Sequence, residues 1–347
     1  MIPVRNVYYM LSYAFRTLNE QGYKSIETEE FHNVAELCAA ILSKGIAAQL
    51  KRGLGKEYIS ETKPLSSPRG KIDIADSVKG LTLLKGQLVC TYDDFSVNSY
   101  MNRIIKTTML VLLKAKISSV RKKELRKLLV YFEGVDVVDI HSINWNIQYN
   151  RNNQTYRMLV SICYLVIKGL LQTQSDGSTK LMVFLDDQRM HRLYERFILE
   201  YYRKEHPELS ANASQIPWQL DDDNKDLLPV MQSDITLRNR KQTLIIDAKY
   251  YAHSLQKHLN HTSVYSFNLY QIFTYVKNME GELSGSTHAP VSGMLLYALT
   301  DSEGALDLEY KMSGNRIAVK TLDLSVDFSL IRDQLDSVVD KYLRKTV

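Results

Sequence analysis

Three polar residues in the second half of the chain have the types and the spacing of a metal-dependent hydrolytic site: Asp234, Asp247 and Lys249. Residues two apart share one face of a strand, so Asp247 and Lys249 project together, beyond the apolar Ile245. Clustered carboxylates suit Mg²⁺, with Mn²⁺ as an alternative, and such a metal polarises a phosphodiester and lowers the pKa of a bound water. We therefore expect Asp234 and Asp247 to be metal ligands, with Lys249 orienting the water or neutralising the transition state.

The surrounding pattern predicts the elements that must position these residues. Two strands are expected at Val230–Leu237 and Thr243–Tyr250, joined by the polar turn Arg238–Gln242, and their pairing would bring Asp234 beside Asp247. Further helices and strands are expected at Met190–Arg203, Asn268–Met279, Ser292–Tyr297, Arg316–Leu322 and Phe328–Arg344. This order predicts an α/β sandwich around a mixed sheet.

The same residues resemble the signature of PD-(D/E)xK nucleases, with Asp234 as the first acid and Asp247-Ala248-Lys249 as the second part. The proline that usually precedes the first acid is replaced by Ser233. An isolated D-x-K sequence on a strand has a second interpretation, a salt-bridged pair at the surface. The resemblance implies an α/β nuclease domain that hydrolyses DNA phosphodiesters.

Two helices accompany this signature. Gln271 and Tyr275 match the QxxxY motif of one branch of the superfamily, and they lie four apart on one helical face, facing the catalytic strand or the DNA backbone. The alternative is a core tyrosine with an incidental glutamine. Superfamily members often supply an acid from the helix before the strands, which is Glu195 here. The alternative is a solvated Glu195 paired with Arg192 or Arg196.

The first half of the chain has a different pattern of expected helices and strands. Helical periodicity is present at Asn6–Leu18, Glu30–Leu50, Asn98–Lys116, Val120–Phe132 and Thr155–Leu171. Short runs typical of strands lie at Tyr58–Pro64, Gly70–Asp73, Leu81–Leu84 and Gln87–Tyr92. The polar stretch Gln172–Lys180 is the best linker candidate. We expect an α+β domain at 1–175 that binds a partner and contains a small β-rich module, followed by the nuclease domain at 176–347.

The chain as a whole resembles the McrC family, because four segments occur in that family's order: Ile2–Leu11, Pro68–Asp73, Asn102–Lys106 and the nuclease motif. McrC proteins are the nuclease subunits of the McrBC modified-cytosine restriction systems. The resemblance implies a hexameric AAA+ GTPase partner that recognises methylated double-stranded DNA, translocates and binds the GTP. No GxxxxGK[ST] loop is present in this chain. A catalytically inactive adaptor that only regulates an AAA+ NTPase is the second hypothesis.

The McrC resemblance also implies that the N-terminal domain stimulates the partner GTPase, by reaching into the pore of the ring. Such a GTPase needs positive charge near the γ-phosphate, or a positioned water. The turn at Arg69-Gly70-Lys71 is expected to form an exposed basic tip, with Gly70 permitting a tight turn. The alternative is a β-turn whose charges are merely solvated.

Composition narrows the function classes. The net charge of +5 is unevenly distributed along the chain. Residues 1–180 contain 25 basic and 16 acidic residues, whereas residues 181–347 contain 19 basic and 23 acidic residues. The excess of positive charge in the first half suggests contact with a polyanion. Three scattered cysteines without a CxxC exclude a disulfide framework and fit a reducing cytoplasm. The most apolar stretch, Met158–Leu171, is short and interrupted by Lys168, so no membrane association is expected. His258 and His261 have the spacing of an alternative metal site.

Overall fold

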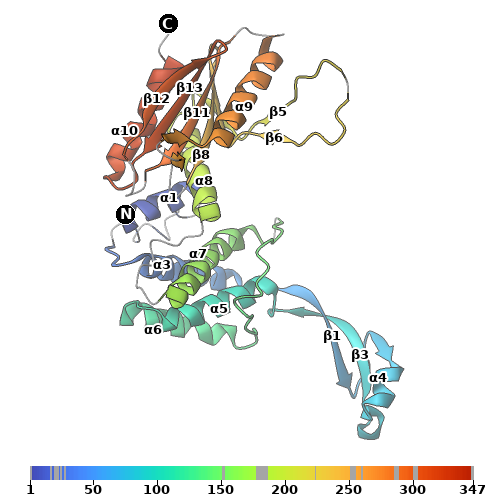
Figure 1. The fold of residues 1–347 in the computed structure, drawn as a ribbon. Helices are drawn as coiled ribbons and strands as arrows, with labels where there is room; N and C mark the ends of the chain where they lie inside the picture. The colour runs from blue at the N-terminus through green and yellow to red at the C-terminus, as the bar shows by residue number, and fades with distance from the viewer. Residues whose placement is uncertain are drawn as a thin grey trace. The chain divides into compact units, whose positions relative to one another are not determined.

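The computed structural model describes residues 2–15, 18, 23, 26, 29–150, 153–176, 187–222, 224–250, 255–258, 261–284, 289–299 and 304–344. The chain divides into two compact units, one of Met1–Glu27 with Met182–Val347 and one of Thr28–Leu181 (Figure 1).

The first 27 residues correct the predicted domain of residues 1–175, because they belong with the C-terminal unit. Helix α1 (Val4–Ala14) packs on α8 (Asp187–Glu205). The Asn6 side chain is 3% exposed and donates to the carbonyls of Leu324 and Val326 at 2.8 and 2.7 Å. The physical reason is that a lone amphipathic helix buries its apolar face wherever a matching surface exists, regardless of sequence distance.

The C-terminal unit is built on a mixed sheet, as predicted. Among the described residues its six strands lie in the order β12 (Asp307–Met312), β13 (Asn315–Leu322), β11 (Val291–Ala298), β8 (Thr243–Lys249), β7 (Ile235–Arg238) and β4 (Ser210–Asn212). Strand β11 is parallel to β8 and β13, whereas the other pairs are antiparallel. Two smaller antiparallel pairs accompany the sheet, namely β5 (Gln215–Ile216) with β6 (Met231–Gln232) and β9 (Leu255–His258) with β10 (His261–Val264).

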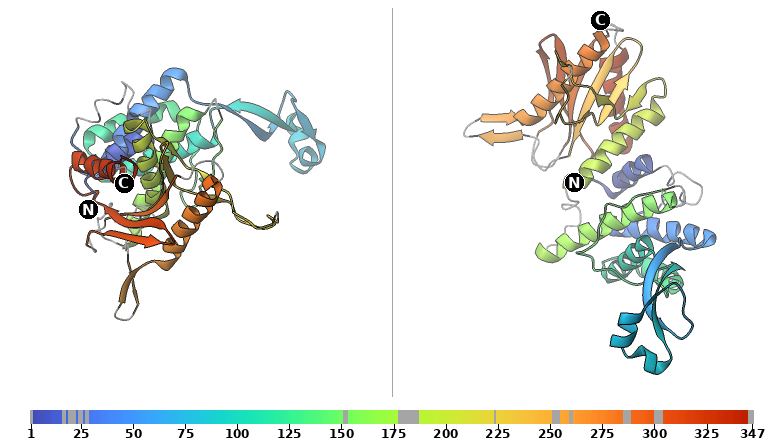
Figure 2. Two further views of the ribbon diagram at one scale, coloured as in Figure 1. Left: turned by 90° about the horizontal axis from the view of Figure 1, so that it is seen from above. Right: turned by 90° about the vertical axis from the view of Figure 1, so that its right-hand side faces the viewer.

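Helices cover the sheet on both faces, which makes the α/β sandwich (Figure 1). Helix α9 (Ser266–Ser284) packs on one face, where Ile272 and Val276 meet Ile245 of β8 in a continuous apolar core. Helix α10 (Phe328–Val339), continued by the π-helical turn η5 (Asp340–Arg344), lies on the other face (Figure 2). Helix α8 packs against β4, β7 and β8.

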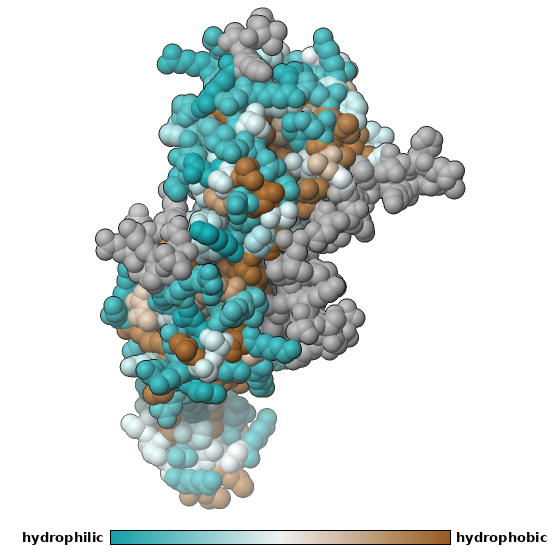
Figure 3. Space-filling model, turned by 90° about the vertical axis from the view of Figure 1, so that its left-hand side faces the viewer, coloured by the Kyte–Doolittle hydropathy of each residue, from teal (hydrophilic) through white to brown (hydrophobic). Residues whose placement is uncertain are grey.

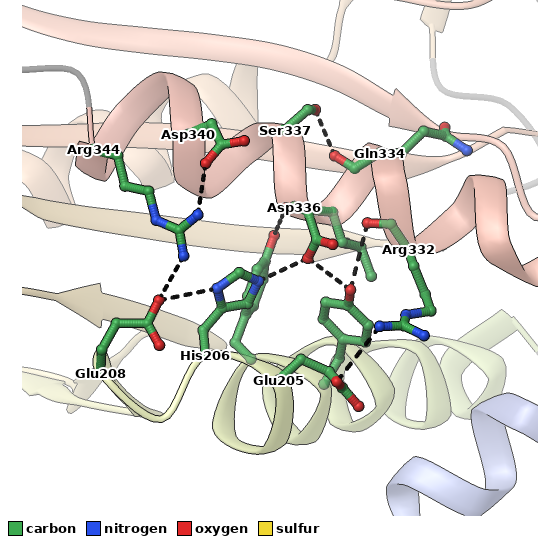
Figure 4. Close-up of polar contacts among 12 residues, drawn as sticks. Glu205, His206, Glu208, Arg332, Gln334, Asp336, Ser337, Asp340 and Arg344 are labelled. Carbon is green, nitrogen blue, oxygen red and sulfur yellow. Dashed lines mark hydrogen bonds and ion pairs between the residues drawn. The ribbon is translucent and has the colours of Figure 1, made fainter.

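A polar network joins the C-terminal end of α8 to α10 and η5 (Figure 4). His206 is 5% exposed; its Nε2 lies 2.7 Å from Asp336 Oδ1, and its Nδ1 lies 3.3 Å from Glu208 Oε1. Tyr201 donates to the same Asp336 oxygen at 2.7 Å, and Arg344 pairs with Glu208 at 2.8 Å. Because these polar groups are partnered across the two helices, the position of α8 on the sheet is fixed.

The Thr28–Leu181 unit contains a group of packed helices: α3 (Val34–Arg52), α5 (Tyr100–Lys114), α6 (Ser119–Leu129) with the 3₁₀ turn η4 (Val130–Phe132), and α7 (Gln154–Asp176). Side-chain caps set two of the helix starts, because Asn33 accepts from the backbone N–H of Glu36 and Ser99 accepts from that of Asn102. No helix in the described ranges has the length and apolarity needed to span a bilayer.

A β-rich arm, defined as residues 57–96, extends from these helices (Figure 1). Strand β1 (Glu57–Leu65) pairs along its length with β3 (Leu88–Ser96), and β2 (Lys71–Asp73) pairs with the other edge of β3. The helical turns α4 (Ile74–Lys79) and η3 (Thr82–Lys85) form the far end. Asn102 anchors the base by donating to the carbonyls of Gly55 and Val97 at 2.9 and 2.8 Å.

The arm corrects two predictions. The run Leu81–Leu84 is not a strand, because Leu81 has a left-handed backbone with φ of 52° and is followed by η3. The segment at Arg69 is exposed, but it is not the tip, since Lys71 pairs with Thr91 in the middle of β3. The far end instead carries a group of exposed apolar side chains (Figure 3) next to Lys79 and Lys85, namely Ile74, Val78, Leu81, Leu83 and Leu84.

Candidate functional site

The predicted hairpin is present and places the two aspartates opposite each other. Strands β7 and β8 are antiparallel, with Ile235 opposite Ile246, so the next pair outward is Asp234 and Asp247. A tight turn closes the other end, where the N–H of Asn239 donates to the carbonyl of Gln242 at 3.1 Å. Asp234 also accepts a hydrogen bond from the backbone N–H of Ala248 through Oδ2 at 2.9 Å, which fixes its carboxylate against β8.

Asp247 and Lys249 form a buried ion pair. Their side chains are 1% and 8% exposed, and Lys249 Nζ lies 2.9 Å from Oδ1 and 2.8 Å from Oδ2 of Asp247. Hydrogen-bond geometry is met only at Oδ1, so within the described residues Oδ2 accepts no hydrogen bond. The interpretation as a surface salt bridge is therefore wrong, because both groups are buried where an unpaired charge costs several kcal/mol, of order 3–5.

Helix α9 holds the lysine from the other side. Gln271 Oε1 lies 3.4 Å from Lys249 Nζ, and Gln271 Nε2 donates to the hydroxyl of Tyr275 at 2.9 Å. The QxxxY pair therefore contacts the strand that carries Asp247 and Lys249, as the pattern indicated. Tyr275 is 8% exposed and also contributes to the apolar core, so the two interpretations of this residue hold together.

Glu195 lies among these groups and is partly buried, with 28% of its side chain exposed. Its carboxylate pairs with His191 Nε2 at 3.2 Å across one turn of α8, rather than with either neighbouring arginine. Burial raises the pKa of Glu195 to about 7, with Lys249 lowering it and Asp247 raising it further. Burial also lowers the pKa of His191 to about 4. His191 was not anticipated from the sequence, although its i, i+4 spacing to Glu195 was the available signal.

The electrostatics of the site favour added positive charge. Burial raises the pKa of Asp234 to about 8, and the nearby Asp247 and Glu195 carboxylates raise it as well. Burial likewise raises the pKa of Asp247, against the lowering effect of Lys249. Lys249 is the cation in direct contact with Asp247, and mutual repulsion among the three acids is the cost that a bound cation would relieve.

The donor set fits a sparsely coordinated hard cation. The described residues contain no group of three or more His, Cys, Asp or Glu side chains arranged to hold a metal ion. Asp234 and Asp247 alone supply two carboxylates, one of which, Asp247, has a buried oxygen without a hydrogen bond. Mg²⁺ is bound in this manner, through one or two carboxylates, several waters and substrate phosphates.

These pKa shifts predict how stability depends on pH in the metal-free protein. Asp234 and Glu195 have pKa values of about 8 and about 7, above the ordinary 3.8 and 4.5. An acid whose pKa is raised by folding stabilises the fold while protonated, and this contribution is lost as pH rises through the folded value. We expect the free energy of unfolding to fall by a few kcal/mol from pH 5 to pH 8, at about 1.4 kcal/mol per pKa unit.

Thermal unfolding of wild type and Asp234→Asn, measured at several pH values with chelator, checks this expectation. Asp234→Asn should flatten the profile, whereas Asp221→Asn, which changes an exposed acid, should leave it unchanged. A wild-type midpoint that is constant or rises between pH 5 and pH 8 contradicts the assigned shifts.

The remaining candidates lie elsewhere. Arg69 belongs to the arm, where its guanidinium lies 3.6 Å from the centroid of the Tyr92 ring and pairs with Asp94 at 3.2 Å. Lys71 is exposed. The backbones of His258 and His261 face each other in the β9–β10 pair, and their side chains lie outside the described residues, as does His253.

Fold and site together define a two-unit α/β protein with a buried carboxylate–lysine centre at the end of a hairpin in a mixed sheet. The chain belongs to the family described as McrBC 5-methylcytosine restriction system component, which matches residues 4–298. It is 29% identical over 350 residues to the Type IV methyl-directed restriction enzyme EcoKMcrBC of Escherichia coli K12, with 99% of each chain covered. The resemblance seen in the sequence is therefore confirmed.

Two solved structures are similar to the chain. One is a half-complex from a tetradecameric assembly of Thermococcus gammatolerans McrB AAA+ hexamers with bound McrC, with a TM-score of 0.47 and 17% identity, covering 97% of this chain and 76% of that one. The other is the Thermococcus gammatolerans McrBC complex, with a TM-score of 0.40 and 17% identity over 58% of each chain.

Proposed function

We propose that this chain is a Mg²⁺-dependent DNA endonuclease of the PD-(D/E)xK type, working as the nuclease subunit of a GTP-dependent restriction complex. The observation that carries the proposal is the position of Asp234 beside the buried pair Asp247 and Lys249, with Gln271 behind the lysine. Family membership supplies the biological setting of modified-cytosine restriction.

The proposed partner is a hexameric AAA+ GTPase similar to McrB. The E. coli relative is named as a McrBC enzyme, and the T. gammatolerans structure contains McrB AAA+ hexamers with bound McrC. We infer the same kind of assembly here, with GTP bound by the partner and double-stranded DNA containing modified cytosine as the substrate. The three cysteines are free and buried, which fits the cytoplasm as the place of action.

The site residues have distinct proposed roles. A bound Mg²⁺ would activate water and stabilise charge on the phosphodiester. Asp234 and Asp247 would hold it, and Asp247 also forms the buried ion pair with Lys249. Lys249 would orient the water or neutralise charge developing on the phosphate. Glu195, whose pKa burial raises to about 7, would be the acid that α8 supplies beside these groups.

An inactive adaptor is the competing function, and burial argues against it. Three acids and a lysine are held close together at one strand end, where their desolvation lowers stability. A protein that only regulates a partner has no use for this cost, whereas a nuclease requires it.

A cleavage assay with the assembled complex tests the proposal. The chain, its AAA+ partner, GTP and Mg²⁺ are combined with double-stranded DNA carrying methylated cytosine. Wild type is expected to cleave, and Asp247→Ala is expected not to cleave while still assembling. Omission of GTP, of Mg²⁺ or of the methyl groups should each abolish cleavage. If Asp247→Ala, free of wild-type contamination, cleaves at the wild-type rate, the site is wrongly assigned.

Metal affinity provides a second prediction. The isolated chain should bind Mg²⁺ or Mn²⁺ only weakly, with a dissociation constant of about 1 mM or above, because two carboxylates form a sparse shell that DNA phosphate completes. Titration calorimetry of wild type and Asp234→Asn with Mg²⁺ or Mn²⁺ measures this affinity. The variant should show no heat of metal binding. Tight stoichiometric zinc that disappears in a His258→Ala, His261→Ala variant would favour the histidine site instead.

The arm is proposed to stimulate GTP hydrolysis by the partner. Arg69 and Lys71 carry positive charge on its surface, and Gly70 is required between them, since it has φ of 70° and an added Cβ would lie 2.3 Å from the Thr91 carbonyl oxygen. Positive charge near a γ-phosphate is a general means of accelerating GTP hydrolysis.

A further inference from the structure

A cavity of about 360 Å³ opens beside Asp234. One wall is a single face of α8, formed by Arg192, Glu195, Arg196 and Leu199, and the opposite wall is formed by Ala213, Gln232, Ser233 and Asp234. The α8 residues follow the i, i+3, i+4, i+7 pattern of one helical face. The cavity therefore shares two carboxylates with the proposed catalytic site and adds two arginines that the mechanism above does not use.

The polar groups of the cavity differ in how they are partnered. The Ser233 hydroxyl already has hydrogen-bond partners within the protein. It bonds to the Thr236 hydroxyl at 2.8 Å and accepts from the backbone N–H of Ser214 at 3.2 Å. The Arg196 guanidinium lies 5.1 Å from the centroid of the Phe15 ring, which orients it. Arg192 differs from both, since no carboxylate in the described part of the chain lies within ion-pair distance of it and its side chain is exposed.

Once a cation is bound, the charges of the cavity stay balanced only if an anion arrives with it. When both of its carboxylates are ionised, Glu195 and Asp234 are offset by the two arginines, so the four charges of the cavity sum to zero. A divalent cation on the aspartates would leave an excess of positive charge, with the donors of Arg192 unused. A phosphodiester monoanion supplies the missing negative charge, and guanidinium groups bind phosphate oxygens in a bidentate manner.

We propose that this cavity binds a backbone phosphate of the DNA strand being cut, with Arg192 as its donor, and so positions the neighbouring phosphodiester against Asp234. The proposal rests on the proposed nuclease function and names a substrate contact within it. Arg196, oriented by Phe15, lies on the same wall of this phosphate subsite, one helical turn from Arg192. Arg192 is a substrate-positioning residue, and Asp234, Asp247 and Lys249 remain the groups that act on the reacting atoms.

The test uses Arg192→Gln, Arg192→Lys and a matched control, Arg240→Gln, in the full chain assembled with its AAA+ partner, GTP and Mg²⁺. Arg240 is an exposed arginine in the turn after β7, at the opposite end of the hairpin from Asp234. Arg192→Gln should raise KM for DNA cleavage by about tenfold or more, with a smaller change in kcat. Arg192→Lys should recover part of this loss, because it keeps the charge without the bidentate geometry, and Arg240→Gln should behave as wild type.

A binding measurement separates this proposal from the nuclease assignment. Affinity for a short DNA duplex is measured against salt concentration, in an Asp247→Ala background that does not cleave. Adding Arg192→Gln should reduce the slope of log affinity against log salt by about one, the value for one lost phosphate contact. An unchanged KM and slope would overturn the phosphate subsite even if wild type cleaves. Conversely, absent cleavage by wild type with a reduced slope would overturn the nuclease assignment and leave the subsite standing.

Discussion

Replacing Asp247 by Asn, or Lys249 by Met, is expected to lower the rate of DNA cleavage by the assembled complex by about a thousandfold or more. Each substitution keeps the approximate shape of the side chain and removes only its charge. Asp247→Asn removes the charge of one of the two proposed metal ligands. Lys249→Met removes the amino group whose Nζ lies 2.8 Å from Asp247 Oδ2. Single-turnover cleavage of methylated duplex measures the loss without contributions from product release.

Stability should change in opposite directions for two variants that lose activity equally. Lys249→Met leaves the carboxylate of Asp247 buried without its cation, so the thermal midpoint should fall at pH 8. Asp234→Asn removes a carboxylate whose pKa is raised to about 8 by burial and by its neighbours, so the metal-free midpoint at pH 8 should rise. A stabilised but inactive Asp234→Asn shows that the lost activity is not a folding defect.

Co-elution of each variant with the partner is the control for assembly. Thr243→Val is a matched control on the same strand, because Thr243 is buried at the far end of β8 and its hydroxyl has no hydrogen bond among the described residues. It should cleave at the wild-type rate. Full activity of Lys249→Met would contradict the proposed role of the lysine.

The hairpin and its charged end were predictable because they depend on local pattern. Side chains along a strand point alternately to its two faces, so Ile245, Asp247 and Lys249 share one face. The short polar turn then sets the strand register that brings Asp234 opposite Asp247. The apolar periodicity of α9 similarly fixes Gln271 and Tyr275 on one face. These relations need only the geometry of one strand pair and one helix, so a single sequence contains them.

The features that were missed depend on tertiary contacts. Whether Glu195 is solvated or buried is decided by how α8 packs on the sheet, and neighbouring arginines in the sequence suggested the wrong partner. The attachment of α1 to the C-terminal unit depends on a surface formed by residues about 320 positions later. In the arm, Asp73 caps α4 by accepting from the N–H of Asp76, which ends the strand pattern before Leu81.

Arg69→Ala combined with Lys71→Ala is expected to remove most of the stimulation of GTP hydrolysis by the partner. Positive charge supplied to a nucleotide site contributes about a thousandfold in the systems where it has been measured, so the loss should be large. Arg69 has a defined orientation, since Tyr92 stacks on its guanidinium and Asp94 pairs with it, while its side chain remains 55% exposed. Partner GTP turnover at saturating chain concentration measures the effect.

A second pair of lysines on the same arm provides the matched control. Lys79 and Lys85 are exposed on α4 and η3, at the far end of the arm. Lys79→Ala with Lys85→Ala removes the same number of positive charges, so a loss shared by both double variants would indicate general electrostatic attraction to the ring. A loss confined to the Arg69, Lys71 pair indicates a specific contact. In the Arg69→Ala, Lys71→Ala variant, DNA cleavage should fall only as far as cleavage depends on GTP turnover by the partner. The reason is that Asp234, Asp247 and Lys249 belong to the other unit. If GTP turnover rises as much with the Arg69, Lys71 variant as with wild type, stimulation does not come from this segment.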